Sequence, residues 1–184
     1  MSPFPIPVFG LLVAFLLVAG RSWGQSVPEP LAQVLRQYQP LAKTGTSVAV
    51  GPGTVQLPPQ ATLGRTGGTD SYTGELHLKG LLIYYDIGKM AGVHVSAYNR
   101  GGNGGKSVPF SAYEERKVDS LQLTLGLRPS PKGSEVVATL QDPSRLLRDS
   151  ASLFPANFWA VVHTEAELQQ FLSVVFSYRP TTRP

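Results

Sequence analysis

Leucine occupies every second position from Leu121 to Leu127, within the stretch 117–127. Side chains two residues apart share one face of a β-strand, whereas a helix aligns side chains three and four residues apart. This stretch therefore predicts a strand with one buried face. Glycine and proline, 19 and 16 of the 184 residues, point the same way, because both disfavour helix interiors and favour turns. We expect a strand-rich fold and not a helical bundle.

Further short segments rich in β-branched and aromatic residues predict more strands. They are 47–50, 54–57, 72–79, 81–87, 93–98, 135–140 and 157–163. Gly80 is expected as a possible bulge within one long bent strand. If no bulge intervenes, His77 and Tyr85 lie on the same face. Residues 88–92 are expected as the turn that brings 93–98 back beside 81–87. Tyr85 then faces His94, and a register shift of one residue puts Asp86 there instead.

Two helices are predicted, one near each end of the folded part. An apolar stripe on one helical face runs from Pro30 to Gln39, where Pro40 ends the helix. A second stripe spans 164–178, and Thr164 and Glu167 have the spacing of a capping box. Asp142-Pro143 is expected to open a short third helix. The predicted fold class is α+β, a mostly antiparallel β-sheet with an N-terminal and a C-terminal helix packed on it.

Residues 1–24 are interpreted as a cleaved signal peptide. The apolar run 9–19 is too short to cross a bilayer, and Ser22 and Gly24 are small residues at −3 and −1 of a cleavage site before Gln25. An uncleaved anchor is the alternative. We expect an exported protein, periplasmic or extracellular, that contacts the membrane only through the signal peptide before cleavage. Residues 25–178 are expected to form a single domain and 179–184 a loose C-terminal tail.

Charge and motif content narrow the function classes. The formal net charge is +4, but Lys and Arg form no cluster of four or more, so no nucleic-acid partner is expected. The absence of cysteine excludes disulfides and thiol chemistry. Gly105-Lys106-Ser107 ends like a phosphate-binding loop, but Arg100 stands where that motif needs glycine and Pro109 opposes the helix that must follow. No cofactor is predicted.

Tyrosines near the central strands suggest a non-catalytic binding or interaction module. Tyrosine gives rigid, amphipathic contact area, suited to a protein, glycan or peptide partner. The candidate ligand-binding residues are Tyr85, His94, Tyr98 and His77. Phe158 and Trp159 are expected in the core.

The alternative hypothesis is a small hydrolase or metal-dependent enzyme centred on His77 and His94. Imidazole and carboxylate are natural ligands of divalent metals, so Asp86, with Glu75, would complete a site with the two histidines. No motif for a serine nucleophile accompanies them.

Overall fold

The computed structural model describes residues 26–40, 45–88, 91, 95, 109–143 and 155–181. Within these residues the chain forms two helices and ten strands, and the expected α+β class is confirmed. The elements in chain order are α1 (Glu29–Gln37), β1 (Thr46–Ala49), β2 (Gly53–Leu57), β3 (Thr62–Gly67), β4 (Ser71–Leu78), β5 (Leu81–Gly88), β6 (Ala112–Val118), β7 (Leu121–Ser130), β8 (Gly133–Gln141), β9 (Ala156–Val162), α2 (Glu165–Ser177) and β10 (Arg179–Pro180).

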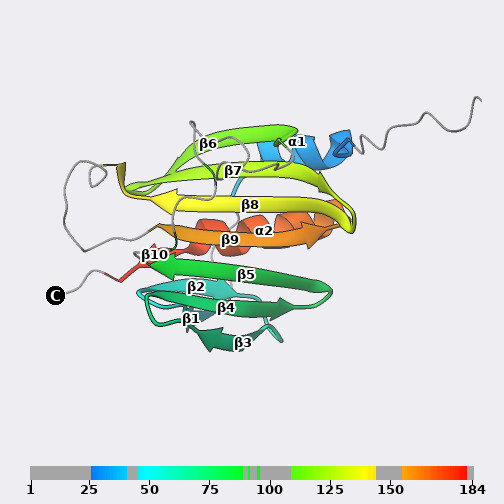
Figure 1. Cartoon of the computed structure of the whole chain (residues 1–184). Helices are drawn as coiled ribbons and strands as arrows, with labels where there is room; N and C mark the ends of the chain where they lie inside the picture. The colour runs from blue at the N-terminus through cyan, green and yellow to red at the C-terminus, as the bar shows by residue number, and fades with distance from the viewer. Residues whose placement is uncertain are drawn as a thin grey trace, which may run out of the picture.

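Seven strands form one antiparallel sheet in the order β3-β4-β5-β9-β8-β7-β6, as Figure 1 shows. Each half is a meander of three consecutive strands, β3-β4-β5 and β6-β7-β8. Strand β9 comes last in the sequence of this sheet and lies between the two halves, paired with β5 on one side and β8 on the other. The sheet is complete only when β9 is in place.

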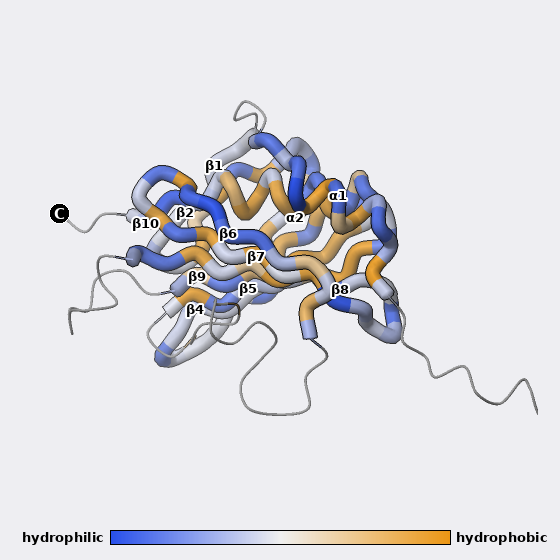
Figure 2. The backbone as a smooth tube through the Cα atoms, turned by 90° about the horizontal axis from the view of Figure 1, so that it is seen from above, coloured by the Kyte–Doolittle hydropathy of each residue, from blue (hydrophilic) through white to orange (hydrophobic). Residues whose placement is uncertain are grey.

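Both helices and the small sheet lie on one side of the large sheet, which Figure 2 shows nearly edge-on. We call this side the inner face and the opposite side the outer face. Side chains alternate between the two faces along each strand. The alternating leucines of β7 are all on the inner face and almost completely buried.

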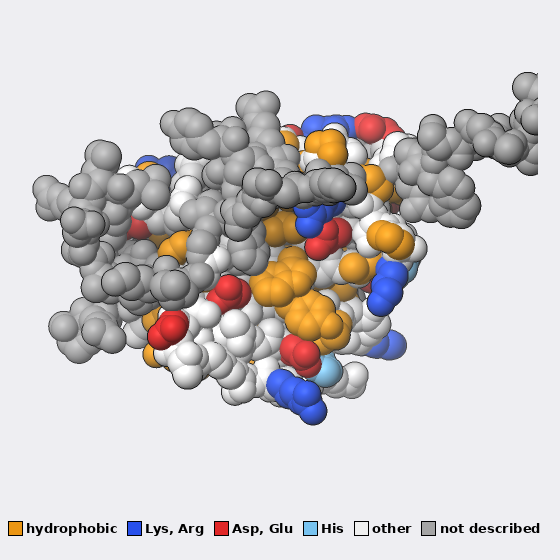
Figure 3. All heavy atoms as spheres, viewed as in Figure 1, with side chains coloured by type: hydrophobic (Ala, Val, Ile, Leu, Met, Phe, Trp, Pro, Cys, Tyr) orange, Lys and Arg blue, Asp and Glu red, His pale blue; other side chains and the backbone are white. Residues whose placement is uncertain are grey.

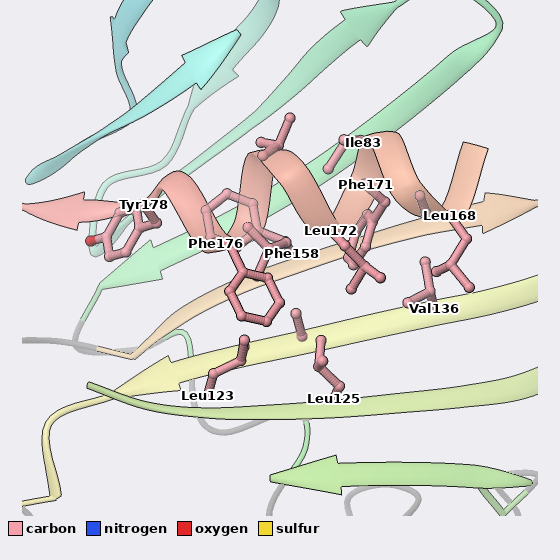
Figure 4. Close-up of a cluster of buried hydrophobic side chains, with 14 of the residues drawn as sticks. Ile83, Leu123, Leu125, Val136, Phe158, Leu168, Phe171, Leu172, Phe176 and Tyr178 are labelled. Atoms are coloured by element: carbon pink, nitrogen blue, oxygen red, sulfur yellow. The ribbon is translucent and has the colours of Figure 1, made fainter. Parts of the chain in front are cut away.

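Helix α2 supplies much of the core. Its N-terminus carries the predicted capping box, in which Thr164 Oγ1 accepts a hydrogen bond from the backbone N–H of Glu167 and the Glu167 carboxylate accepts one from the N–H of Thr164. Phe171 and Leu172 are fully buried against the inner face, where Phe158 of β9 meets them (Figure 4). Burial of one such side chain contributes about 1.5–3 kcal/mol, so this helix is held mainly by its apolar face.

Helix α1 buries Leu31 and Leu35 and contacts α2 and β6. Its C-terminal end is held by Arg116 of β6, whose guanidinium donates hydrogen bonds to the backbone carbonyls of Leu35, Arg36 and Tyr38. Helix ends leave such carbonyls without partners inside the helix. Arg116 therefore closes the helix end and fastens it to the edge of the large sheet.

The small sheet has the order β1-β2-β10. Arg179 and Pro180 pair with β2, and the N–H of Thr181 bonds to the carbonyl of Pro52. The expectation that residue 179 begins a loose tail is therefore wrong. The pairing follows from α2, since that helix ends at Ser177 beside β2 and its Ser177 hydroxyl accepts a hydrogen bond from Gln56 N–H at 2.8 Å.

The predicted bent strand 72–87 is instead a hairpin. Gly80 has φ +79°, a conformation that favours glycine, and the chain reverses at 79–80, so that Leu78 pairs with Leu81. The reversal changes the face assignment. His77 lies opposite Leu82 on the outer face, whereas Tyr85 lies opposite Gly74 on the inner face. The expectation that His77 and Tyr85 share a face is wrong.

Two strands were not expected from the sequence. Strand β6 lies in a charged stretch that reads as a solvated turn, and the predicted strand 117–127 is in fact divided at Asp119, whose φ of +53° marks the turn between β6 and β7. Strand β3 lies at the sheet edge and is mostly exposed. Both are edge strands, which need less apolar content than central ones.

The expected pairing of 81–87 with 93–98 is also wrong. Strand β5 pairs with β4 along one edge and with β9 along the other, so neither edge is open to a further strand. Tyr85 consequently lies opposite Gly74 and Phe158, not opposite His94. A short helix was expected to open at Asp142-Pro143. The residues that follow, 144–154, lie outside the described part of the chain.

Candidate binding face of the large sheet

The outer face bears the side chains that alternate with the core residues. On β5 and β9 these are Leu82, Tyr84, Asp86, Asn157, Trp159 and Val161. No helix of the described part of the chain lies over this face (Figures 1 and 2). Polar and aromatic side chains in such positions are not needed for the core, and this makes them candidates for binding.

One cross-strand row of this face is largely aromatic. Positions directly opposite one another, from β6 to β5, are Tyr113, Gly126, Val137, Trp159 and Tyr84, which we call the aromatic row. The rings of Tyr84 and Trp159 are nearly parallel, with 18° between their planes and 5.8 Å between their centroids. Tyr84 is 37% exposed. In Figure 3 hydrophobic side chains gather near the centre of this face, with acidic and basic side chains around them.

Phe110 completes the row where Gly126 has no side chain. A β-carbon on Gly126 would lie 2.5 Å from the Phe110 ring, so glycine is needed for this ring to reach the sheet. The guanidinium of Arg128 lies 5.3 Å from the centroid of the same ring and also pairs with Glu135. The cation and the sheet together hold Phe110 in place.

A second row, two residues along each strand, is polar and mostly buried. It consists of Thr124, Thr139, Asn157 and Asp86, in order from β7 to β5. The Thr139 hydroxyl donates to Asn157 Oδ1 at 2.7 Å and accepts from the N–H of Val95 at 3.0 Å. Among the described residues, Asp86 Oδ1 is buried without a hydrogen-bond partner. This row anchors residue 95 to the outer face.

A pocket of about 360 Å³ lies at the β3–β4 end of the aromatic row, at the lower end of the roughly 300–1,000 Å³ typical of small-molecule sites. Tyr84 and Trp159 form one wall, and Arg65, Thr73 and Glu75 are among its other lining residues. A bulge in β3 places the arginine. Leu63 pairs with Leu76 and Thr66 with Gly74, so Gly64 and Arg65 together lie opposite Glu75.

Of the four predicted ligand-binding residues, the two that the structure describes, His77 and Tyr85, lie on opposite faces of the sheet. His77 is exposed on the outer face, with its Nε2 3.1 Å from Glu75 Oε2. Tyr85 is on the inner face, only 2% exposed, and burial raises the pKa of its hydroxyl. His94 and Tyr98 lie outside the described residues.

The proposed metal ligands are also separated where they can be placed. His77 pairs with Leu82, four residues from Asp86 along β5, which corresponds to about 13 Å at the rise of a strand. Within the described ranges, no three His, Asp or Glu side chains are grouped closely enough to hold a metal ion.

A larger cavity, of about 1010 Å³, lies on the other side of the molecule between the C-terminal ends of both helices, β2 and β6. Several of its charges have structural partners. Arg179 pairs with Asp119 at 2.8 Å, and Arg116 holds the end of α1. Because these charged side chains already make contacts that stabilise the fold, this cavity is the weaker candidate for a ligand site.

Trp159 is the functional candidate that the sequence interpretation missed. It was expected in the core with Phe158, but the two side chains are on opposite faces, and Trp159 is partly exposed beside Tyr84. The available signal was the alternation of a strand, because Phe158 and Trp159 are adjacent residues and must point to opposite faces.

The chain matches no family model, and no curated protein or solved structure is significantly similar to it. In the part of the chain that the structure describes, neither helix has the length and apolar character required to traverse a bilayer.

Proposed function

We propose that this protein is an exported, non-catalytic binding module whose ligand lies on the outer face of the large sheet, against Tyr84 and Trp159. The observation that carries the proposal is the pair of nearly parallel, partly exposed rings on adjacent strands beside a pocket. Neighbouring exposed apolar side chains with polar residues around them are typical of interaction and ligand-binding sites.

The rigidity of the scaffold supports this proposal. Strands β5 and β9 lie inside the sheet and each pairs on both edges. Side chains on such strands lose little further conformational entropy when a ligand binds, and this preorganisation favours affinity. Tyr84 and Trp159 are also directly opposite each other, so the spacing of their rings is set by the sheet.

Export is part of the proposal and rests on the apolar run 9–19 and the small residues before Gln25. Mass spectrometry of the protein recovered from its native source tests it. A mature N-terminus at Gln25 is expected, and an intact Met1 would contradict cleavage.

Intrinsic fluorescence offers a direct test of the binding face. The chain has two tryptophans, Trp23 and Trp159, and Trp23 lies within the proposed signal peptide. The full chain carrying Trp23→Phe therefore reports on Trp159 alone, whether or not the peptide is removed. We would titrate this variant with oligosaccharides and short peptides and measure its melting temperature in parallel. A ligand at about 100 times its Kd adds about 2.7 kcal/mol of stability.

Tyr84→Ala is the test variant and Tyr72→Ala the matched control. Tyr72 is 55% exposed but packs against Gly51 of the β1–β2 turn, away from the outer face. Binding that is weakened by Tyr84→Ala and unchanged by Tyr72→Ala is the expected result. Ligands that bind both variants equally would refute the location, and a hydrolytic activity lost in His77→Ala would refute the non-catalytic proposal.

A further inference from the structure

We propose that the pocket beside Tyr84 and Trp159 binds a neutral saccharide, through a hexopyranose ring with equatorial hydroxyl groups. This inference rests on the proposed function and names the ligand class for the same site. It is argued from the shape of the aromatic wall, the charges around the pocket and the hydrogen-bonding groups that line it.

The aromatic wall fits the apolar face of a sugar. A pyranose with equatorial hydroxyls exposes only axial C–H groups above and below its ring. These hydrogens carry a small positive charge and are attracted to the negative face of an aromatic ring. Tyr84 and Trp159 carry two such rings, stacked 18° from parallel with 5.8 Å between their centroids, so each can offer a ligand the face that the other ring does not cover. An axial hydroxyl on the ring face turned toward the wall would stand between the sugar and the wall and would keep them apart.

The charges around the pocket favour a neutral ligand. The ionisable groups of opposite sign that line it are Arg65 and Glu75, one cation and one anion. They lie opposite each other because of the β3 bulge. A phosphate or a carboxylate ligand would be attracted by Arg65 but repelled by Glu75, whereas a neutral ligand is free of this conflict.

The same groups suit the hydrogen bonding of a sugar. Each sugar hydroxyl both donates and accepts, and vicinal equatorial hydroxyls match the two oxygens of a carboxylate or two N–H groups of a guanidinium. Glu75, whose Oε2 also lies 3.1 Å from His77 Nε2, supplies the acceptor, chiefly through Oε1. Arg65 supplies the donor, and the hydroxyls of Thr66 and Thr73 can serve as either. The volume of about 360 Å³ is that of a small site, consistent with one ring of a longer chain.

The β-1,4-linked tetrasaccharides of glucose and of mannose make a matched pair of probes, because they differ only in the orientation of O2. We would titrate the full chain carrying Trp23→Phe with each and follow the emission of Trp159. A saturable change with the glucose probe is expected, together with weaker binding of the mannose probe, because the axial O2 of mannose prevents one of the two ring faces from stacking. Tyr84→Ala should raise the Kd for the glucose probe by about tenfold.

Glu75→Gln provides a second variant, which keeps the shape of the side chain but reduces its strength as an acceptor. We expect several-fold weaker binding of the glucose probe. Tyr72→Ala and the melting temperature of each variant serve as controls for folding.

The outcomes separate this inference from the proposed function. No saturable response to either probe up to about 10 mM, a weak Kd by the scale of small ligands, would overturn the saccharide assignment. If short peptides then bind with dependence on Tyr84, the proposed function stands and only the ligand class is wrong. If the glucose probe binds equally well to Tyr84→Ala, the location fails, and with it both proposals.

Discussion

Replacing Arg116 with alanine should free the C-terminal end of α1. In the folded protein the Arg116 guanidinium donates to three backbone carbonyls, those of Leu35, Arg36 and Tyr38, and lies 5.9 Å from the centroid of the Phe176 ring. Alanine removes all three hydrogen bonds at once. Water can reach this part of the surface and replaces some of them.

The expected loss follows from the number of bonds. At about 1 kcal/mol for each hydrogen bond, three bonds give about 3 kcal/mol. Partial solvent exposure lowers this figure and the contact with Phe176 raises it. We therefore expect Arg116→Ala to reduce the free energy of unfolding by about 2–4 kcal/mol, and Arg116→Lys by an intermediate amount, because an ammonium group cannot span three carbonyls as a planar guanidinium does.

Urea unfolding followed by circular dichroism measures this loss, and amide hydrogen exchange in α1 locates it. Lys117→Ala is the matched control, since Lys117 is the next residue of β6 but is exposed on the opposite face. Its effect should stay within about 0.5 kcal/mol. The reasoning would be refuted if Arg116→Ala cost no more than Lys117→Ala, or if exchange in α1 did not increase.

Three further predictions concern the core and its ends. Gly74→Ala should destabilise the protein by about 1–3 kcal/mol in the same urea titration, because the new β-carbon would lie 2.3 Å from the Tyr85 hydroxyl. Gly67→Ala is the control and should change the stability little, because the nearest atom to its β-carbon would be 3.8 Å away. Thr164→Ala removes half of the capping box and should cost about 1 kcal/mol by thermal unfolding. Burial raises the pKa of Tyr178 from 10.0 to about 12. The free energy of unfolding is therefore unaffected by this group below pH 10 and falls by about 3 kcal/mol between pH 10 and 12. Tyr178→Phe should flatten that decline.

The parts of the fold that depend on neighbouring residues could be predicted from the sequence. The end of α1 before Pro40 and the capping box of Thr164 are local signals, and both helices form where those signals place them. Most strands were also located, because the alternation of apolar and polar residues is local. The pairing of the strands is not local, and this is where the interpretation failed, at Gly80 and at the two edges of β5.

Strand β6 shows that a run of charged residues can form a strand. Its run of charged residues resembles a solvated turn, yet Arg116 is on the inner face of a strand because it bonds to the end of a helix about 80 residues earlier in the chain. A contact over that distance leaves no mark in the surrounding sequence. An inward-pointing charge on an edge strand also discourages pairing with another sheet, so the same residue serves both the helix and the edge.

The binding face depends on a single register. Two adjacent aromatic residues occur on β5, Tyr84 and Tyr85, and two on β9, Phe158 and Trp159. The sheet pairs Tyr84 with Trp159 and Tyr85 with Phe158, so one pair is on the outer face and the other in the core. A shift of one residue in either strand would exchange core and surface for that strand. The sequence alone allows either choice, whereas packing selects one: Gly74 leaves room on the inner face for Tyr85. The contacts that bury Tyr85 and Phe158 are therefore also what places Tyr84 and Trp159 side by side at the candidate site.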